Sequence, residues 1–324
     1  MLYFVSDASL CHIPAHVPNS LLSEYAQLLL DTGIDQLEMP YLIWEQLRAV
    51  VPAQKVMLLI QYPKERERAL KEGATAFLVE DAIFAERFPD QYPDVTVICP
   101  VDGRGIMGDT RHVAKRSAHI RAAGFADGMI GDYATKFVKL RCAAFSLDVE
   151  DSCGLATSSS LEWLMAGGKA VSATFGGVGG RTPLEQLLAA LRVICQQPYS
   201  LKQMPRLRVL FNQIFGLVVS AHAPVVGTEI FTYESGIHAD GIQKSPKTYE
   251  PFPPEDVGME RRLSIGKHSG KSALRVKLHE LGVQLSDGEL EQMNVRVRAE
   301  STRLRRGFTD EELLVLKKSL HGKR

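Results

Sequence analysis

Residues 20–61, SLLSEYAQLLLDTGIDQLEMPYLIWEQLRAVVPAQKVMLLIQ, alternate between two patterns that decide the fold. Apolar residues recur at helical spacing in Ser20–Asp31 and Leu42–Val50. Between and after them, Gln36–Met39 and Val56–Gln61 are short runs of residues that favour strands. Strands that alternate with helices in this way indicate βαβ units and a parallel sheet.

The same alternation continues as far as Cys195. The strand-like runs are Leu2–Leu10, Gln36–Met39, Val56–Gln61, Ala76–Val79, Val95–Cys99, Gly128–Gly131, Ala144–Val149 and Ala170–Phe175. The helix-like stretches are Ser20–Asp31, Leu42–Val50, Lys64–Glu72, Ile83–Phe88, Asp109–Ala123, Ser158–Ala166 and Pro183–Cys195. Eight strands of this kind predict a closed (β/α)8 TIM barrel, and the alternative is an open doubly wound sheet. The connection Asp132–Ala143 is short for a crossover helix, so we expect a truncated sixth helix.

The pattern changes after Cys195, where the alternation of strands and helices stops. Ser286–Glu289 and Thr309–Glu312 match the capping-box pattern and predict the starts of two closing helices. We therefore expect three parts, which are a barrel over residues 1–198, a linker and first subdomain over 199–285, and C-terminal helices over 286–324.

Composition places the chain among ordinary globular proteins, with 45% apolar and 23% charged residues. The 38 basic and 38 acidic residues cancel, so nothing in the charge favours a nucleic acid or a membrane surface as partner. No apolar run is long enough for a membrane span, and the first residues do not resemble a signal peptide. Five scattered cysteines are typical of thiols in a reducing cytoplasm.

The most specific segment is residues 229–270, EIFTYESGIHADGIQKSPKTYEPFPPEDVGMERRLSIGKHSG. It contains ESGIHxDG at 234–241, YExF at 249–252 and GKHSG at 266–270. In order and spacing these motifs closely resemble the linker and first subdomain of homocitrate synthase and 2-isopropylmalate synthase. These are the Claisen-condensing members of a family of metal-dependent TIM-barrel acyltransferases.

The resemblance implies a reaction and its cofactors. In the family, a divalent metal (Mg²⁺, Mn²⁺ or Zn²⁺) at the mouth of the barrel polarises the carbonyl of a 2-oxo acid. A base then removes a proton from the methyl group of acetyl-CoA, the enolate attacks the carbonyl, and the thioester is hydrolysed. The motifs are most similar to those of the homocitrate synthases of nitrogen fixation, which implies 2-oxoglutarate as the acid. Members of the family dimerise, so the resemblance also implies a homodimer or a heteromer with a homologue.

The end of the first strand departs from the family pattern. The family motif Asp-Thr-Thr-Leu-Arg-Asp-Gly-Glu-Gln corresponds here to residues 7–15, DASLCHIPA. The catalytic arginine has become Cys11 and the metal-binding aspartate has become His12. A neutral thiol does not replace a guanidinium, and losing such a group typically lowers the rate by about 100- to 1,000-fold.

The seventh strand departs as well, because Asp148-Val-Glu150 stands where the family has His-x-His on the metal. The family asparagine after strand eight also has no counterpart. One interpretation is that the metal site has decayed. The other is that its ligands were exchanged, since His12, Asp148 and Glu150 could form a triad for Mg²⁺ or Mn²⁺.

Other family positions keep their residue types. His238 and Tyr249 match residues that reach a barrel mouth, in several members the partner's, and take part in proton transfer. The alternative is that His238 only supports the local turn. Glu38 matches a glutamate that faces the substrate, and Asp132 matches the aspartate that ends strand six.

Three hypotheses follow for the function. The chain could condense acetyl-CoA with a 2-oxo acid or catalyse a derived reaction. It could instead be a non-catalytic paralogue that pairs with a complete homologue. Finally, it could be a binding module whose altered pocket recognises an organic acid.

Overall fold

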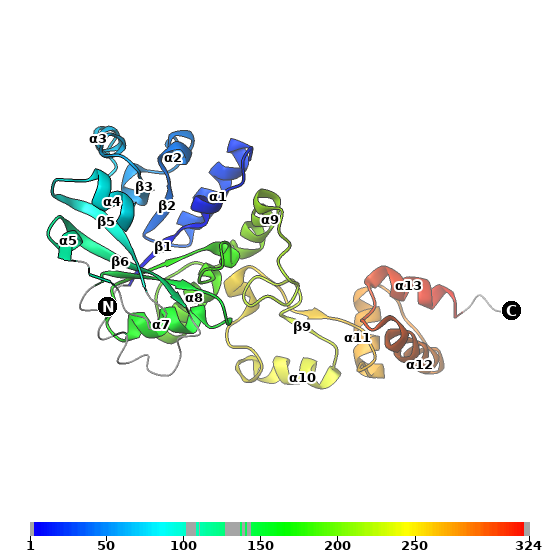
Figure 1. Ribbon diagram of the computed structural model, residues 1–324. Helices are drawn as coiled ribbons and strands as arrows, with labels where there is room; N and C mark the ends of the chain where they lie inside the picture. The colour runs from blue at the N-terminus through cyan, green and yellow to red at the C-terminus, as the bar shows by residue number, and fades with distance from the viewer. Residues whose placement is uncertain are drawn as a thin grey trace. The chain divides into compact units, whose positions relative to one another are not determined.

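Eight parallel strands close into a barrel in the computed structural model, which describes residues 3–101, 108, 109, 111–126, 137, 140 and 144–320 (Figure 1). The strands follow chain order around the barrel, and β1 closes it by pairing with β8. Their bounds are β1 (Phe4–Asp7), β2 (Gln36–Pro40), β3 (Val56–Leu59), β4 (Phe77–Glu80), β5 (Tyr92–Pro100), β6 (Ser117–Ala126), β7 (Ser146–Glu150) and β8 (Ala170–Ala173). The predicted barrel is confirmed, and the open sheet is wrong.

Helices surround the barrel on its outside (Figure 1). They are α1 (Asn19–Asp31), α2 (Tyr41–Leu47), α3 (Pro63–Lys71), α4 (Asp81–Arg87), α5 (Arg111–Ala114), α7 (Ala156–Met165) and α8 (Leu184–Cys195). In α1 the buried residues are Leu22, Tyr25, Ala26 and Leu29, which is the spacing of one helix face. This face also contacts α9 (Met204–Phe215), where the Tyr25 and Phe215 ring centroids lie 6.1 Å apart.

The prediction for the sixth repeat is wrong. We expected a helix over Asp109–Ala123, but α5 ends at Ala114 and residues 117–126 form β6. The segment is rich in alanine, which favours helices, yet pairing with β5 and β7 on both sides overrides that preference. Gly124 lies at a register shift within β6. The expected strand at Gly128–Gly131 and Asp132 lie outside the described residues, as does most of Asp132–Ala143, where the truncated helix was expected.

The chain divides into two compact units, Met1–Val226 and Gly227–Arg324. The second unit contains the short parallel pair β9 (Thr232–Tyr233) and β10 (Arg262–Leu263). Its helices are α10 (Gly236–Lys244), α11 (Lys271–Glu280), α12 (Asp287–Leu304) and α13 (Asp310–Lys318). Its core is formed mainly by apolar side chains of α11, α12 and α13. The predicted division at residues 198 and 285 stays a prediction.

Both predicted capping boxes are present. The Ser286 hydroxyl accepts a hydrogen bond from the Glu289 N–H, and the Glu289 carboxylate accepts one from the Ser286 N–H. Thr309 and Glu312 make the same exchange. These bonds satisfy N–H groups that a helix start otherwise leaves free, and they explain why α12 and α13 begin where they do.

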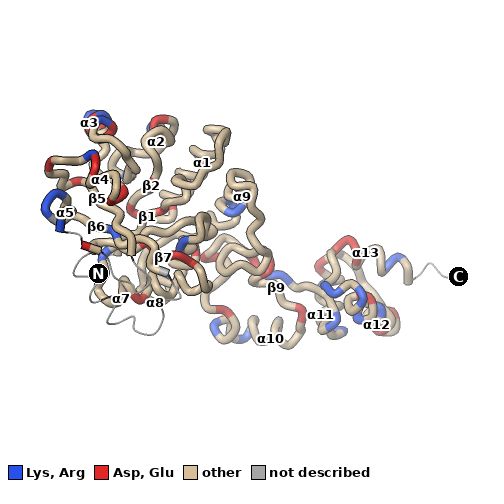
Figure 2. Tube along the Cα trace, in the orientation of Figure 1, with Lys and Arg blue, Asp and Glu red and all other residues tan. Residues whose placement is uncertain are grey.

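Charged residues of both signs lie side by side on the outer helices, for example on α3 and α12 (Figure 2). Among the described residues, no helix is both long and apolar enough to cross a membrane.

Candidate functional site

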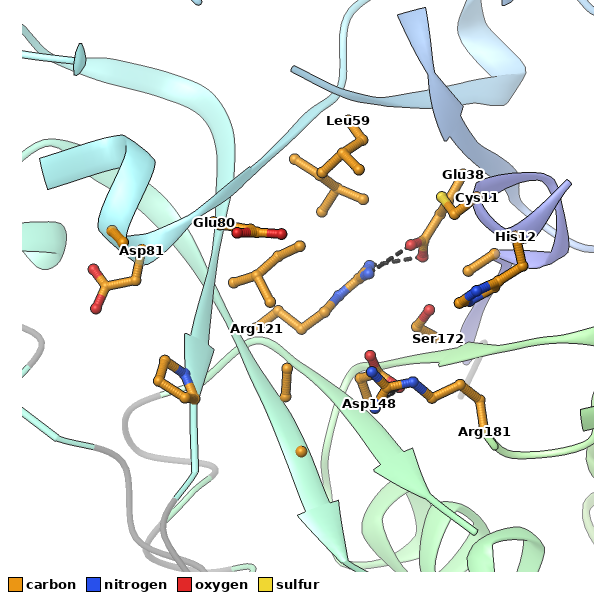
Figure 3. A pocket seen from close by; sticks show the side chains of 17 residues that line it. Cys11, His12, Glu38, Leu59, Glu80, Asp81, Arg121, Asp148, Ser172 and Arg181 are labelled. Atoms are coloured by element: carbon orange, nitrogen blue, oxygen red, sulfur yellow. Dashed lines mark hydrogen bonds and ion pairs between the residues drawn. The ribbon is translucent and has the colours of Figure 1, made fainter. Parts of the chain in front are cut away.

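A cavity of about 650 Å³ opens at the carboxyl ends of the barrel strands (Figure 3). We call it the barrel-mouth pocket. Its apolar side is formed by Leu59, Leu78, Ile98 and Pro100. Its polar lining residues are Cys11, His12, Glu38, Glu80, Asp81, Arg121, Asp148, Ser172 and Arg181. Active sites of such barrels lie at this end, so the pocket is the candidate site.

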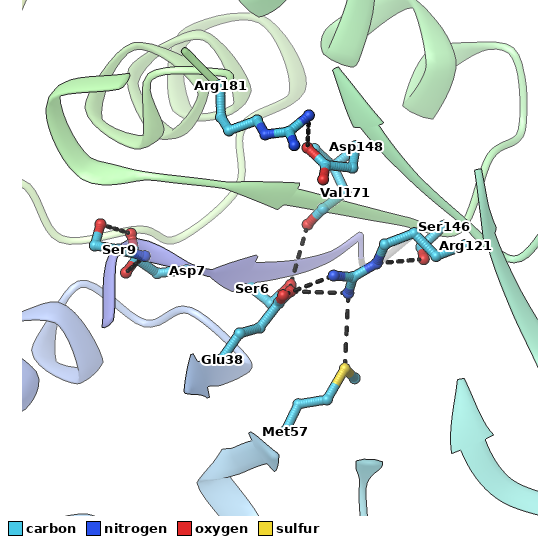
Figure 4. Close-up of polar contacts among 10 residues, drawn as sticks. All are labelled: Ser6, Asp7, Ser9, Glu38, Met57, Arg121, Ser146, Asp148, Val171 and Arg181. Carbon is cyan, nitrogen blue, oxygen red and sulfur yellow. Dashed lines mark hydrogen bonds and ion pairs between the residues drawn. The ribbon is translucent and has the colours of Figure 1, made fainter. Parts of the chain in front are cut away.

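A buried ion pair between Glu38 and Arg121 lies in the pocket (Figure 4). Arg121 Nη1 lies 2.6 Å from Glu38 Oε2, and Nη2 lies 2.8 Å from Oε1, so the contact is bidentate. Arg121 Nε also donates to the Ser146 hydroxyl at 3.2 Å, and the Ser6 hydroxyl donates to Glu38. Burial alone would raise the pKa of Glu38, but the Arg121 charge and these hydrogen bonds hold it below its usual value.

Asp7, at the end of β1, ties this strand to the end of β8. It accepts hydrogen bonds from the N–H and hydroxyl of Ser9 and from the Phe175 N–H. Burial nevertheless raises the pKa of Asp7 to about 7. The contacts hold the turn that carries the next two pocket residues, Cys11 and His12.

Cys11 and His12 are both uncharged near neutral pH. Burial raises the pKa of the Cys11 thiol well above its usual value, so the reactive thiolate is scarce. Burial and the Arg181 charge lower the pKa of His12. The His12 ring packs closely on the loop after β8, where a Cβ added to Gly179 would lie 2.5 Å from His12 Cε1.

Asp148 and Glu150 meet the same arginine. Arg181 Nη1 lies 3.6 Å from Asp148 Oδ1 and 3.7 Å from Glu150 Oε1. Asp148 lines the pocket, whereas Glu150 is exposed and does not. Burial raises the pKa of Asp148 to about 6, against the opposing charges of Arg181 and Arg121. A carboxyl group with such a pKa can exchange a proton near neutral pH.

The donor set does not fit a divalent ion. In the part of the chain that the structure describes, no three His, Cys, Asp or Glu side chains are grouped so that they could hold a metal. His12, Asp148 and Glu150 are not brought together as a triad, because both carboxylates face the Arg181 guanidinium. The exchange of ligands therefore stays a prediction without support from this geometry.

His238 and Tyr249 lie together in the second unit. Their ring centroids are 5.7 Å apart with an interplanar angle of 73°, and both line a small cavity of about 240 Å³. Tyr249 packs on Gly241, where a Cβ would lie 2.4 Å from the phenol oxygen. The motif residues thus form one local cluster, and their part in proton transfer stays a prediction.

Arg121 and Arg181 line the pocket, but neither stands out in the sequence as a site residue. Arg121 lies in Asp109–Ala123, a segment whose pattern predicts a helix on the outside of the barrel. Interpreting Ser117–Ala126 as a strand would have placed an arginine in the barrel opposite Glu38. Glu38 lines the pocket and its carboxylate is engaged by Arg121, and its part in catalysis stays a prediction.

A closed barrel with a charged pocket at the carboxyl ends of its strands defines the class, a (β/α)8-barrel protein built like the enzymes of that fold. An HMG-CoA lyase of Acinetobacter baumannii, solved with coenzyme A and 3-methylmalate, shares this fold with a TM-score of 0.53 at 16% identity. The match covers 68% of this chain and 94% of the lyase.

Sequence comparisons identify the relatives more closely. Residues 225–303 match the family described as "Homocitrate synthase post-HMGL domain-like". Homocitrate synthase AksA of Methanothermobacter thermautotrophicus is 39% identical over 45% of this chain and 38% of its own length. Homocitrate synthase 1 of Nostoc sp. is 38% identical over 56% of this chain and 50% of its own length. The chain thus spans half or less of these curated relatives. It is related to the homocitrate synthase and 2-isopropylmalate synthase family, and the predicted resemblance is confirmed.

Proposed function

We propose that this chain is a homocitrate synthase-like protein whose parental reaction is the Claisen condensation of acetyl-CoA with a 2-oxo acid, 2-oxoglutarate in the first place. The match of residues 225–303 to the post-barrel domain supports this origin. The barrel-mouth pocket supports it too, because it lies where barrel enzymes bind their substrates.

We further propose that the chain does not catalyse this condensation by itself. The observation that carries the proposal is that both arginines of the pocket already lie against carboxylates. Arg121 is bound to Glu38, and Arg181 lies between Asp148 and Glu150. A condensing site needs a cation available to the oxygen on which negative charge develops. Cys11 replaces the family arginine and supplies no charge.

Release of coenzyme A from acetyl-CoA tests this proposal. The purified chain is incubated with 2-oxoglutarate, pyruvate or 2-oxoisovalerate, each with Mg²⁺, Mn²⁺ or Zn²⁺, beside a complete homocitrate synthase as positive control. We expect no thiol release above the enzyme-free rate. Turnover that Asp148→Ala abolishes would show that the pocket is catalytically competent.

A second candidate function is that of a partner for a complete homologue. It is favoured by the contrast between the second unit, which keeps the family motifs with His238 beside Tyr249, and the altered barrel mouth. We propose that this unit lends its cluster to a homologue's barrel. Co-expression with a complete homologue followed by affinity capture tests this, with His238→Ala expected to lower the activity of the pair. Self-association alone would oppose it.

A further inference from the structure

Arg181 lies between Asp148 and Glu150 of β7. By the family resemblance, these two carboxylates stand at the positions of the metal-binding histidines. A single nitrogen, Nη1, lies within 4 Å of both Asp148 and Glu150. At 3.6 and 3.7 Å these contacts are longer than hydrogen bonds. Nη1 is buried and has no hydrogen-bond partner among the described residues. The guanidinium is therefore held by charge, with one donor still unused.

The backbone around Arg181 places this side chain firmly. Arg181 and Glu150 form an isolated antiparallel bridge, and the Asp151 N–H donates to the Gly180 carbonyl at 2.9 Å. One residue further on, the Thr182 and Ser160 hydroxyls lie 2.8 Å apart in a buried contact. The loop after β8 is thus tied to the end of β7. The fold therefore fixes the backbone position from which the Arg181 side chain reaches the pocket.

A divalent ion and this guanidinium would compete for the same oxygens. Mg²⁺ and Mn²⁺ bind carboxylate oxygens directly, at about 2.0–2.1 Å for Mg²⁺. The remaining polar neighbours are poor substitutes, because His12 is packed against Gly179 and the Glu38 carboxylate is bound by Arg121. An ion could use Asp148 and Glu150 only by displacing Arg181 against the repulsion of like charges.

We propose that Arg181 is the resident cation of the barrel-mouth pocket and keeps divalent metal ions out of it. The inference about Arg181 rests on the proposed function in one respect, which is that the pocket is taken to be the former substrate site.

Calorimetric titration with MnCl2 tests the proposal without any assay of activity. The wild-type chain should give no binding heat. Arg181→Met keeps the aliphatic stem but removes the charge, and it should bind Mn²⁺ at least tenfold more tightly than the wild type. Adding Asp148→Asn to this variant should abolish the gain. Arg48→Met removes an exposed arginine paired with Glu72 and is the matched control, which should behave as the wild type.

Two results would overturn the proposal. One is Mn²⁺ binding by the wild-type chain that Asp148→Asn removes, because Arg181 would then not exclude the ion. The other is a folded Arg181→Met protein that gains no Mn²⁺ affinity. If that variant does not fold, by circular dichroism, Arg181→Gln replaces it with the same two outcomes. Because the readout is binding heat, it is independent of whether the chain condenses acetyl-CoA.

Discussion

At the scale of single residues, Glu38 and Arg121 form a buried, bidentate ion pair inside the barrel. Both side chains are nearly fully buried, with 3% and 4% of their side-chain surfaces exposed. Removing two charges from water is costly, and the bidentate geometry and the hydrogen bonds from Ser6 and to Ser146 help to compensate for it. The pair therefore tolerates the loss of both partners better than the loss of one.

We predict that Arg121→Met lowers the free energy of unfolding by about 3–5 kcal/mol, because it leaves the Glu38 carboxylate buried without a counter-charge. The double variant Glu38→Gln with Arg121→Met should recover much of this loss, since no unpaired charge remains. Urea denaturation of the two variants and the wild type measures both effects. If the double variant is less stable than Arg121→Met alone, the charge argument is wrong.

Glu185 offers a residue-scale test of pH dependence. This buried side chain on α8 accepts a hydrogen bond from the Gly176 N–H at 2.9 Å, and burial raises its pKa from 4.5 to about 7. Between these values the folded chain keeps a proton that the unfolded chain has lost. Stability therefore falls as the pH rises through this interval.

We predict that Glu185→Gln removes this fall, because glutamine keeps the acceptor oxygen and carries no charge. The free energy of unfolding of the variant minus that of the wild type should be about 2 kcal/mol higher at pH 8 than at pH 5. Urea unfolding at the two pH values measures the difference. Parallel stability profiles for the two proteins would contradict the assigned shift.

The order of strands along the chain could place some candidate residues. Glu38, His12 and Asp148 line the pocket, and their roles stay predictions. What could not be deduced is how charges pair across the barrel, since Arg121 and Glu38 are 83 positions apart in the chain. Which carboxylate pairs with which arginine depends on the register of the strands and on the closure of the barrel. The positions of the strands in the sequence give neither.

At the scale of elements, the loop after β8 joins the two sides of the pocket. Gly179 and Gly180 have φ values of 76° and 68°, in the region that residues with a side chain rarely adopt. They differ in their surroundings. A Cβ on Gly179 would meet the His12 ring at 2.5 Å, whereas one on Gly180 would have no neighbour within 4 Å.

We predict that Gly180→Ala costs about 1 kcal/mol from backbone strain alone. Gly179→Ala should cost about 1 kcal/mol more, because the His12 ring must also move. Urea denaturation gives both values, and the NMR signals of the His12 ring should shift only in Gly179→Ala. Equal stabilities with an unchanged His12 spectrum would rule out the packing of this ring on the loop.

Most barrel elements could be predicted because their patterns are local. The strand β2 and the helices α1 and α8 lie close to their predicted bounds. The strand β6 could not be predicted, because its sequence SAHIRAAGFA (Ser117–Ala126) has small residues that suit a helix as well as a strand. Pairing with β5 and β7 makes this segment a strand. Those two strands are distant pairing partners that a local sequence pattern does not contain.

At the scale of the whole molecule, the chain consists of two units with separate cores. The first is the barrel with its helices, whose closure joins Phe4 of β1 to Ala170 of β8. Sequence alternation predicted this closure because eight repeats leave the last strand beside the first. The second unit shows no such alternation, and its relation to known proteins came from the motifs of residues 229–270.

If the units unfold separately, a core substitution in one should leave the other unchanged. Leu274 of α11 is fully buried in the second core, whereas Val276 of the same helix is 50% exposed. We predict that Leu274→Ala destabilises the second unit by about 2–5 kcal/mol, and that the matched control Val276→Ala changes it by about 0.5 kcal/mol or less.

The two tryptophans make this measurable, because Trp44 and Trp163 both lie in the first unit. Tryptophan fluorescence during urea unfolding therefore follows the barrel, while far-ultraviolet circular dichroism follows both units. In Leu274→Ala an early transition should appear in the dichroism and the fluorescence midpoint should stay at its wild-type value. A fluorescence midpoint that falls together with the dichroism would mean that the units unfold as one cooperative block, in spite of their separate cores.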